Sequence, residues 1–295
     1  ENGPFWHIYT DGAVTQNIFC SDDVMTKGMM ALAVAAVLFG KVKLITFELM
    51  SNHVHMILSG TQDDCLELFA RFKQRLKGVF RSIGRVVDWE SFQPDTIRID
   101  SLKSLRNEII YVNRNAYVVR ADYTPFSYPW GGGWAYFTPV ISKLPVKTVK
   151  EVGFNRSREL TGCRDVARLT QLRFLDDVVF IPSFCSIDIG ESFFHDAKTY
   201  FYSLTRNIEA FSEIAARLKD KVFVTQNELY AIAFEMAAKE FDVRQLNLLS
   251  PEQKITLAKE LHYKYNATIQ QLRRILNLDI NILTQLFPSP PNCRA

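Results

Sequence analysis

The segment FELMSNHVHMIL, residues 47–58, combines the end of one strand, a tight turn at Ser51 and Asn52, and the start of a second strand. Within the second strand, His53 and His55 are two residues apart and therefore face the same side of a sheet. Two imidazoles at this spacing can hold one divalent metal ion, although two polar residues on a solvated strand face explain the pattern equally well. Two ligands rarely suffice for a metal, so a third polar side chain has to come from another element.

The elements around this segment predict an α+β domain. Strands are expected at residues 4–12, 41–50, 53–60 and 95–99. Helices are expected at residues 22–39, at 62–83 with Thr61 as N-cap, and from 102 to about 117 with Ser101 as N-cap. This order predicts a largely antiparallel sheet with helices packed on one face.

The composition favours a folded protein in a reducing, cytoplasmic compartment. The 295 residues are 47% hydrophobic, and five scattered cysteines form no CxxC pair. The longest apolar run, residues 29–40, is too short to span a bilayer, and no signal peptide is visible. We therefore expect no membrane partner, no disulfide framework and no cysteine-based zinc site.

The second half of the chain has a different texture. Residues 1–150 carry 17 Lys and Arg against 14 Asp and Glu, whereas residues 151–295 carry 18 of each. The pattern after about residue 150 is mostly helical, which predicts one domain at 1–150 and a helical accessory domain at 151–295. Residues 251–287 of that domain predict a helix-turn-helix-like unit with a turn at 277–279. A structural or protein-contact role for this unit is favoured over DNA reading, because its last helix has no Lys or Arg.

The helix that ends near residue 117 places one tyrosine apart from its apolar face. At about 100° per residue, its apolar residues share one arc, and Tyr111 falls opposite that arc. Asn115 lies one turn further along on the same side as Tyr111. Periodicity alone favours simple exposure of Tyr111, and the other interpretation is that Tyr111 faces a ligand.

The helix at 62–83 and the residues after it carry positive charge without nearby acids. No Asp or Glu occurs between residues 68 and 87. An ordinary solvated face is the simple interpretation, but this many uncompensated charges favour a polyanion such as DNA. The basic residues are Arg71, Lys73, Arg75, Lys77, Arg81 and Arg85.

Two motifs together resemble the single-tyrosine HUH transposases, particularly the REP-associated tyrosine transposases. MSNHVHMIL (50–58) is similar to the family's M-P-N-H-V-H-L-L, and YVNRNAYVVRADYTPFSYPW (111–130) is similar to Y-I-x-x-N-P-V-x-A-G followed by a D-Y-x-W-S-S-like segment. The resemblance covers about residues 4–137. Ala116 stands where the family has proline, so we expect the helix to continue past Asn115.

The resemblance implies a ferredoxin-like sheet and cleavage and rejoining of single-stranded DNA near hairpins through a 5′-phosphotyrosine. Tyr111 would be the nucleophile, and His53, His55 and Asn115 would bind a divalent ion, with Mg²⁺ or Mn²⁺ expected. Arg114 joins the basic residues as a DNA contact, no small-molecule cofactor is expected, and monomer or homodimer is left open. The alternatives are a catalytically silent DNA-binding protein derived from such an enzyme, a replication-initiator or relaxase-type nickase, and a metal hydrolase.

Overall fold

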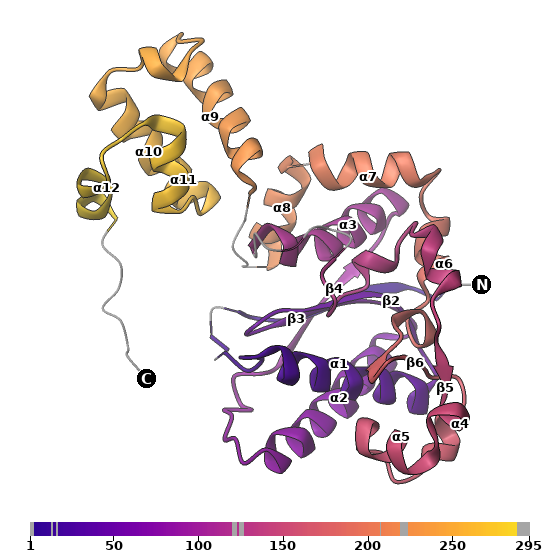
Figure 1. Cartoon of the computed structure of the whole chain (residues 1–295). Coiled ribbons are helices and arrows are strands. Elements are labelled where there is room, and N and C mark those ends of the chain that lie inside the picture. The colour runs from indigo at the N-terminus through magenta and orange to yellow at the C-terminus, as the bar shows by residue number, and fades with distance from the viewer. Residues whose placement is uncertain are drawn as a thin grey trace. The chain divides into compact units, whose positions relative to one another are not determined.

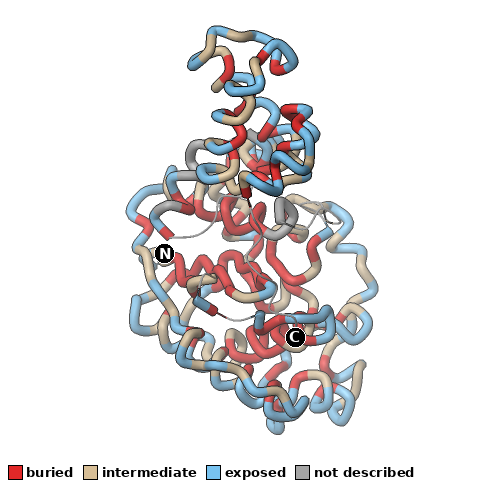
Figure 2. The backbone as a smooth tube through the Cα atoms, turned by 90° about the vertical axis from the view of Figure 1, so that its left-hand side faces the viewer, coloured by how far each residue is buried: buried red, intermediate tan, exposed pale blue. Residues whose placement is uncertain are grey.

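The computed structural model describes residues 3–12, 14–15, 17–119, 123, 127–206, 208–218 and 224–287. The chain forms two compact units, Glu1–Asn207 and Ile208–Ala295 (Figure 1). The sequence predicts a boundary near residue 150, but the division lies well after it, at Asn207. Buried backbone, red in Figure 2, is concentrated inside the units, with exposed turns around it. No helix in the described ranges is long and apolar enough to cross a membrane.

The first unit is built on a four-stranded antiparallel sheet with the strand order β2-β3-β1-β4. The α+β class and the antiparallel sheet are therefore confirmed. β1 and β3 lie at the centre and pair with each other, so both are covered by a neighbour on each side. The strands are β1 (Phe5–Thr10), β2 (Lys43–Leu49), β3 (Val54–Ser59) and β4 (Pro94–Ile99).

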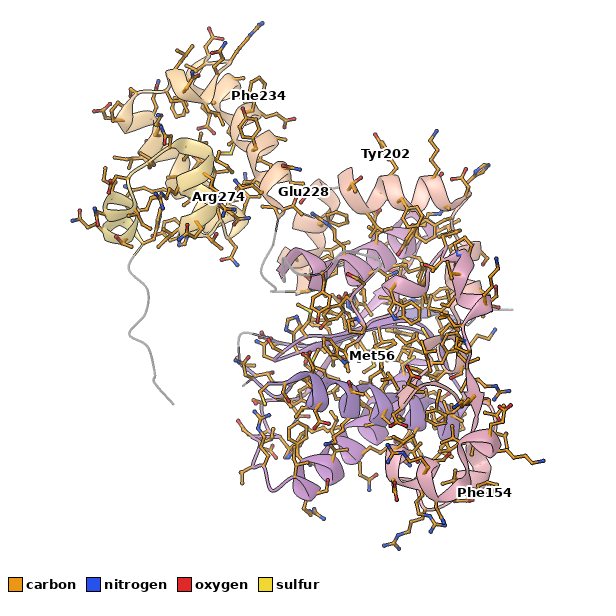
Figure 3. All side chains as sticks on the ribbon, viewed as in Figure 1. Met56, Phe154, Tyr202, Glu228, Phe234 and Arg274 are labelled. Carbon is orange, nitrogen blue, oxygen red and sulfur yellow. The ribbon has the colours of Figure 1, made fainter. Side chains whose placement is uncertain are left out.

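Helices cover both faces of this sheet. α1 (Asp22–Phe39) and α2 (Gln62–Ser82) pack together on one face, and α3 (Leu102–Val119) lies on the other (Figure 1). Met56 marks the apolar layer on the α1 side (Figure 3). The expectation of helices on one face holds for α1 and α2 but is wrong for α3. α3 also continues past Ala116, as the missing proline predicts.

Local sequence explains where α1 and α2 begin and where α1 ends. The side-chain oxygens of Ser21 and Thr61 accept hydrogen bonds from the amides of Val24 and Asp64, which satisfies N–H groups that the first helical turn leaves open. α1 ends at Gly40, whose φ of 65° is a left-handed conformation that glycine adopts without strain.

A glycine-rich loop closes the outer edge of β2. Gly131 forms an isolated bridge with Glu48, and the Gly132 amide donates to the Phe47 carbonyl at 2.8 Å. A Cβ on Gly132 would lie 2.5 Å from the Thr46 hydroxyl oxygen, so only glycine allows this close approach. The loop pairs an edge that would otherwise be open to other chains.

Residues 133–206 complete the first unit with short elements. Helices α4 to α7 and a small three-stranded sheet follow the loop. The elements are η1 (Gly133–Ala135), η2 (Pro139–Lys143), β5 (Lys147–Thr148), α4 (Val149–Val152), α5 (Phe154–Thr161), η3 (Val166–Leu169), β6 (Arg173–Leu175), β7 (Val178–Val179), η4 (Ile181–Ser183), α6 (Ile187–Ser192) and α7 (Ala197–Arg206).

These elements share the core of the sheet, which explains why the boundary is not near residue 150. The Tyr200 ring of α7 stacks on Tyr136 at 5.4 Å between centroids, and its hydroxyl accepts a hydrogen bond from Asn113 Nδ2 at 3.0 Å. Phe184 packs 5.5 Å from Phe47 of β2. The sequence pattern becomes mostly helical after about residue 150. The apolar side chains of residues 133–206 nevertheless belong to the core of the first unit.

The second unit is a small helical bundle. α11 and α12 lie where the sequence predicts them, and Asn277 begins the turn between them with a left-handed φ of 50°. Three of its helices begin with reciprocal capping boxes, in which Thr225, Ser250 and Thr268 are the N-caps. The elements are α8 (Ile208–Leu218), α9 (Gln226–Phe241), η5 (Leu246–Leu248), α10 (Pro251–Tyr265), α11 (Ile269–Leu276) and α12 (Ile280–Leu286).

Candidate active site

The two histidines of the HVH segment lie together on the α3 face of the sheet. His55 is in the central strand β3, in register with Tyr9 of β1 and Glu48 of β2, and His53 directly precedes the strand. Their ring centroids are 5.0 Å apart. His53 is 7% exposed and His55 is 1% exposed, so a solvated strand face does not explain the pair.

α3 brings Tyr111 and Asn115 to the same place. The Tyr111 ring is 5.7 Å from the His55 ring between centroids, and Asn115 Nδ2 is 3.4 Å from His55 Nε2. Tyr111 is only 5% exposed, so exposure, the simpler interpretation from periodicity, is wrong. α3 is covered on both sides because residues 133–206 pack over the face that points away from the sheet. The four predicted chemical residues therefore form one buried cluster.

Two further residues of the cluster were missed by the sequence analysis. His7 Nε2 lies 3.0 Å from His55 Nδ1, and His7 Nδ1 lies 2.8 Å from Glu108 Oε2. The side chains of His7 and Glu108 are fully buried. A period of two along β1 places His7 on the His55 face, and Glu108 precedes Tyr111 by three residues on α3. Both signals are present in the sequence, but neither His7 nor Glu108 belongs to the motifs at residues 50–58 and 111–130.

A tyrosine of β1 also borders the cluster. The Tyr9 ring is nearly parallel to the His55 ring, with 6.2 Å between centroids, and it is buried. The cluster therefore contains two tyrosines near His55, one from the sheet and one from α3. Tyr9 provides a matched reference for any experiment on Tyr111.

The donor set fits a divalent metal ion only if Asn115 contributes its amide. No group of three or more His, Cys, Asp or Glu residues in the described part of the chain is arranged to hold an ion. Turning the Asn115 amide by 180° would exchange Nδ2 for Oδ1, about 3.4 Å from His55 Nε2. Ligand atoms about 2.1 Å from a tetrahedral or octahedral metal are themselves about 3.0–3.4 Å apart, which matches this separation.

Asn52 sets the orientation of the other imidazole. Its side-chain Oδ1 lies 2.7 Å from His53 Nδ1 and accepts a hydrogen bond when that nitrogen carries the proton. In this tautomer the lone pair of His53 is on Nε2, the nitrogen that would bind a metal. The imidazoles of His53 and His55 and the amide oxygen of Asn115 are thus the residues that would hold the ion.

The basic residues predicted to bind DNA do not surround this cluster. Six of them belong to α2 or follow it, and α2 lies on the opposite face of the sheet from His55. Arg71 pairs with Glu67 at 2.8 Å, and Arg85 donates to the carbonyls of Asn17 and Ile18 at 2.6 and 2.7 Å. Arg114, on α3, is buried.

The remaining basic residues of α2 differ in their surroundings. The Arg75 guanidinium lies 4.0 Å from the Cys163 sulfur. Partial burial and the neighbouring Lys77 hold the pKa of Lys73 below its usual range. Lys77 and Arg81 are exposed. The open positive surface is therefore smaller than the sequence predicts, and it consists mainly of Lys73, Lys77 and Arg81.

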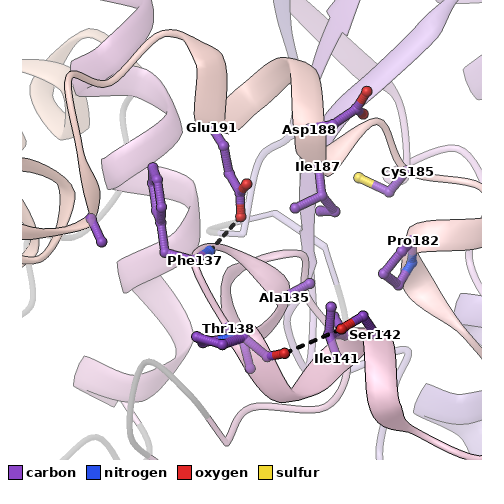
Figure 4. A pocket seen from close by; sticks show the side chains of 12 residues that line it. Ala135, Phe137, Thr138, Ile141, Ser142, Pro182, Cys185, Ile187, Asp188 and Glu191 are labelled. Atoms are coloured by element: carbon purple, nitrogen blue, oxygen red, sulfur yellow. Dashed lines mark hydrogen bonds between the residues drawn. The ribbon is translucent and has the colours of Figure 1, made fainter.

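The first unit also contains a cavity that no sequence motif indicated. It has a volume of about 610 Å³ and lies between the 135–142 segment and α6 (Figure 4). The Phe137 amide donates to Glu191 Oε1 at 2.5 Å at this cavity. Burial raises the pKa of the Cys185 thiol well above its usual range, so this thiol is a poor nucleophile.

Comparison with models of known protein families found no match, and comparisons with curated proteins and with solved structures found no significant match.

Proposed function

We propose that the protein is a metal-dependent DNA strand transferase of the single-tyrosine HUH type, which cleaves and rejoins single-stranded DNA near hairpins. One observation carries the proposal: α3 places Tyr111 and Asn115 against the His53–His55 pair, although about fifty residues separate the two motifs. A helix that serves only to cover the sheet does not require a tyrosine and an amide, one turn apart, facing paired imidazoles.

The fold supports the same proposal. Strand, helix, two strands, helix and strand follow in the order of a split βαβ arrangement, and the sheet order β2-β3-β1-β4 places the last strand beside the first. We propose that this is a ferredoxin-like HUH domain, with the histidines on a central strand and the tyrosine helix across it.

The chemistry assigned to these residues is a transesterification. The Tyr111 hydroxyl oxygen attacks the phosphorus, a bond from phosphorus to tyrosine forms, and the bond to the 3′ oxygen breaks. The phenol loses one proton and the leaving 3′ oxygen gains one, so bonds and protons balance and the reverse step rejoins the strand. A bound Mg²⁺ or Mn²⁺ would neutralise a non-bridging phosphate oxygen.

Access to the cluster is the main constraint on this chemistry. The side chains of His53, His55, Tyr111 and Asn115 are all buried. A scissile phosphate therefore has to displace part of the chain that covers them before Tyr111 can attack. Lys73, Lys77 and Arg81 lie on the other side of the sheet and would hold a different stretch of the DNA backbone.

The test is formation of a covalent adduct on a labelled single-stranded hairpin with Mn²⁺, comparing Tyr111→Phe with Tyr9→Phe. We expect the wild type and Tyr9→Phe to form the adduct, and Tyr111→Phe to lose it by at least about 100-fold, because the proposal assigns the nucleophilic oxygen to Tyr111 and phenylalanine lacks it. Single-stranded DNA should still bind to Tyr111→Phe.

The other outcomes separate the alternatives. An adduct that persists in Tyr111→Phe and disappears in Tyr9→Phe would assign the nucleophile to β1. DNA binding by the wild type without any adduct would favour a catalytically silent DNA-binding protein. An adduct that forms but is never rejoined to a second strand would favour a nickase of the replication-initiator or relaxase type.

A further inference from the structure

Two buried residues behind His55 form a chain of hydrogen bonds that ends on a carboxylate. Glu108 Oε2 lies 2.8 Å from His7 Nδ1, and His7 Nε2 lies 3.0 Å from His55 Nδ1. Glu108 comes from α3, His7 from β1 and His55 from β3, so three separate elements meet at this chain. All three side chains are essentially inaccessible to solvent.

We propose that His7 and Glu108 are positioning residues that hold His55 as the tautomer with its proton on Nδ1. We take Glu108 as ionised and His7 as neutral; the carboxylate then only accepts hydrogen bonds, and the proton between the two groups lies on His7 Nδ1. In a neutral His7, Nε2 is then an acceptor, and the proton between the two imidazoles lies on His55 Nδ1. The lone pair of His55 is consequently on Nε2, which faces Asn115.

The opposite arrangement would disable the site. If His7 were doubly protonated, its Nε2–H would donate to His55 Nδ1, and a neutral His55 would carry its proton on Nε2. That proton would occupy the position that a metal needs. The Asn115 side-chain amide, 3.4 Å from His55 Nε2, can present either its nitrogen or its oxygen to that atom, so it is the chain from Glu108 through His7 that selects between the two arrangements.

The carboxylate at the far end also affects the strength of the ligand. A hydrogen-bond acceptor behind a metal-binding imidazole fixes its ring orientation and raises its basicity, and loss of such a partner typically lowers metal affinity about 10–100-fold. A buried His–Glu pair could exist only to stabilise the fold, but that role does not require contact with His55 Nδ1. The functional consequence rests on the proposed metal site, whereas the tautomer itself does not.

The tautomer can be measured directly in the metal-free, full-length protein. Long-range ¹H–¹⁵N correlation spectra of ¹⁵N-histidine-labelled protein distinguish protonated from unprotonated ring nitrogens. We expect a protonated Nδ1 at His55 in the wild type. His7→Gln retains an acceptor oxygen near the position of Nε2 and should keep this tautomer, whereas His7→Leu removes the acceptor and should shift His55 toward the Nε2–H form.

Metal affinity and a second position complete the design. By titration calorimetry with Mn²⁺, we expect His7→Leu to weaken binding about 10–100-fold and His7→Gln to remain within about threefold of the wild type. Glu108→Leu removes the acceptor at the far end of the chain and should weaken binding by about tenfold, whereas Glu108→Gln keeps an acceptor oxygen and should remain closer to the wild type. His195→Leu removes an exposed histidine and serves as the matched control.

The outcomes separate this inference from the proposed function. An Nε2–H tautomer in the wild type, or a tautomer unchanged in a folded His7→Leu protein, overturns the positioning role. If His7→Leu does not fold, the same spectrum of Glu108→Leu decides, and a His55 signal identical to the wild type together with unchanged Mn²⁺ affinity overturns it. The expected tautomer in a protein that binds no Mn²⁺ and forms no adduct supports the positioning role and refutes the proposed enzyme.

Discussion

Truncation after residue 150 should destroy the first unit, whereas truncation after Asn207 should preserve it. The shorter fragment removes Phe184 and Tyr200, which pack on Phe47 and Tyr136. Each buried aromatic side chain contributes about 1.5–3 kcal/mol. The Tyr200 hydroxyl is also the partner of Asn113 Nδ2, and a buried donor without its partner costs about 1–3 kcal/mol. Together these losses reach about 4–9 kcal/mol, against a total stability of about 5–15 kcal/mol for a typical domain.

The assay is urea unfolding followed by circular dichroism and tryptophan fluorescence for fragments 1–150 and 1–207 and for the full chain; all four tryptophans lie within residues 1–150. We expect a single cooperative transition for 1–207, and an aggregated or non-cooperative fragment 1–150. Tyr200→Phe in the full chain is the control, and it should lower the stability of the first unit by about 1–3 kcal/mol. A soluble fragment 1–150 that unfolds cooperatively, with a midpoint close to that of 1–207, would refute the shared core.

Two further predictions concern a close contact at the site and the cysteines. Gly12→Ala should weaken Mn²⁺ binding, because its Cβ would lie 2.7 Å from His53 Nδ1 and displace the ring. The control Gly78→Ala has open space around it inside α2, so it should leave Mn²⁺ binding unchanged and add about 1 kcal/mol of stability. Equal Mn²⁺ affinities of Gly12→Ala and the wild type in calorimetry would contradict the first expectation. Burial and the neighbouring Asp64 raise the pKa of Cys65 from 9.0 to about 12, so iodoacetamide near pH 8 should modify exposed Cys20 and spare Cys65. The stabilising effect of the neutral Cys65 thiol should decline as the pH rises from about 9 toward 12. Rapid labelling of native Cys65, detected by mass spectrometry, would refute its burial.

Local patterns predict the elements of this fold well. Strand alternation, N-cap residues and helical periodicity locate β1 to β4 and α1 to α3, because these signals depend on neighbouring residues. The spacing of His53 and His55 also fixes their common side, since it follows from the pleat of a strand. A motif resemblance then connects them with Tyr111 and Asn115, which the structure places beside His55.

Long-range packing explains what the sequence did not predict. Tyr111 is buried because α3 lies between the sheet and residues 133–206, and helical periodicity describes one apolar face but not a second covering layer. The bond between His7 and Glu108 joins residues 101 positions apart, so no window of local sequence contains both. For the same reason, the sequence predicts the domain boundary near residue 150, whereas the structure divides the chain after Asn207. A helical sequence pattern does not show which hydrophobic core a helix joins.

The placement of charge and chemistry on opposite faces of the sheet determines how future variants should be interpreted. Lys73, Lys77 and Arg81 on the α2 side cannot touch a phosphate held by His55 on the α3 side, because a layer of strands lies between them. If the proposed function is correct, removal of these charges should weaken DNA binding and its salt dependence without changing the rate of attack on bound DNA. A change at His7 or Glu108 should do the reverse, since His7 contacts His55, Glu108 contacts His7, and both side chains are buried. Binding constants and single-turnover rates therefore have to be measured separately before a loss of activity is assigned to either face.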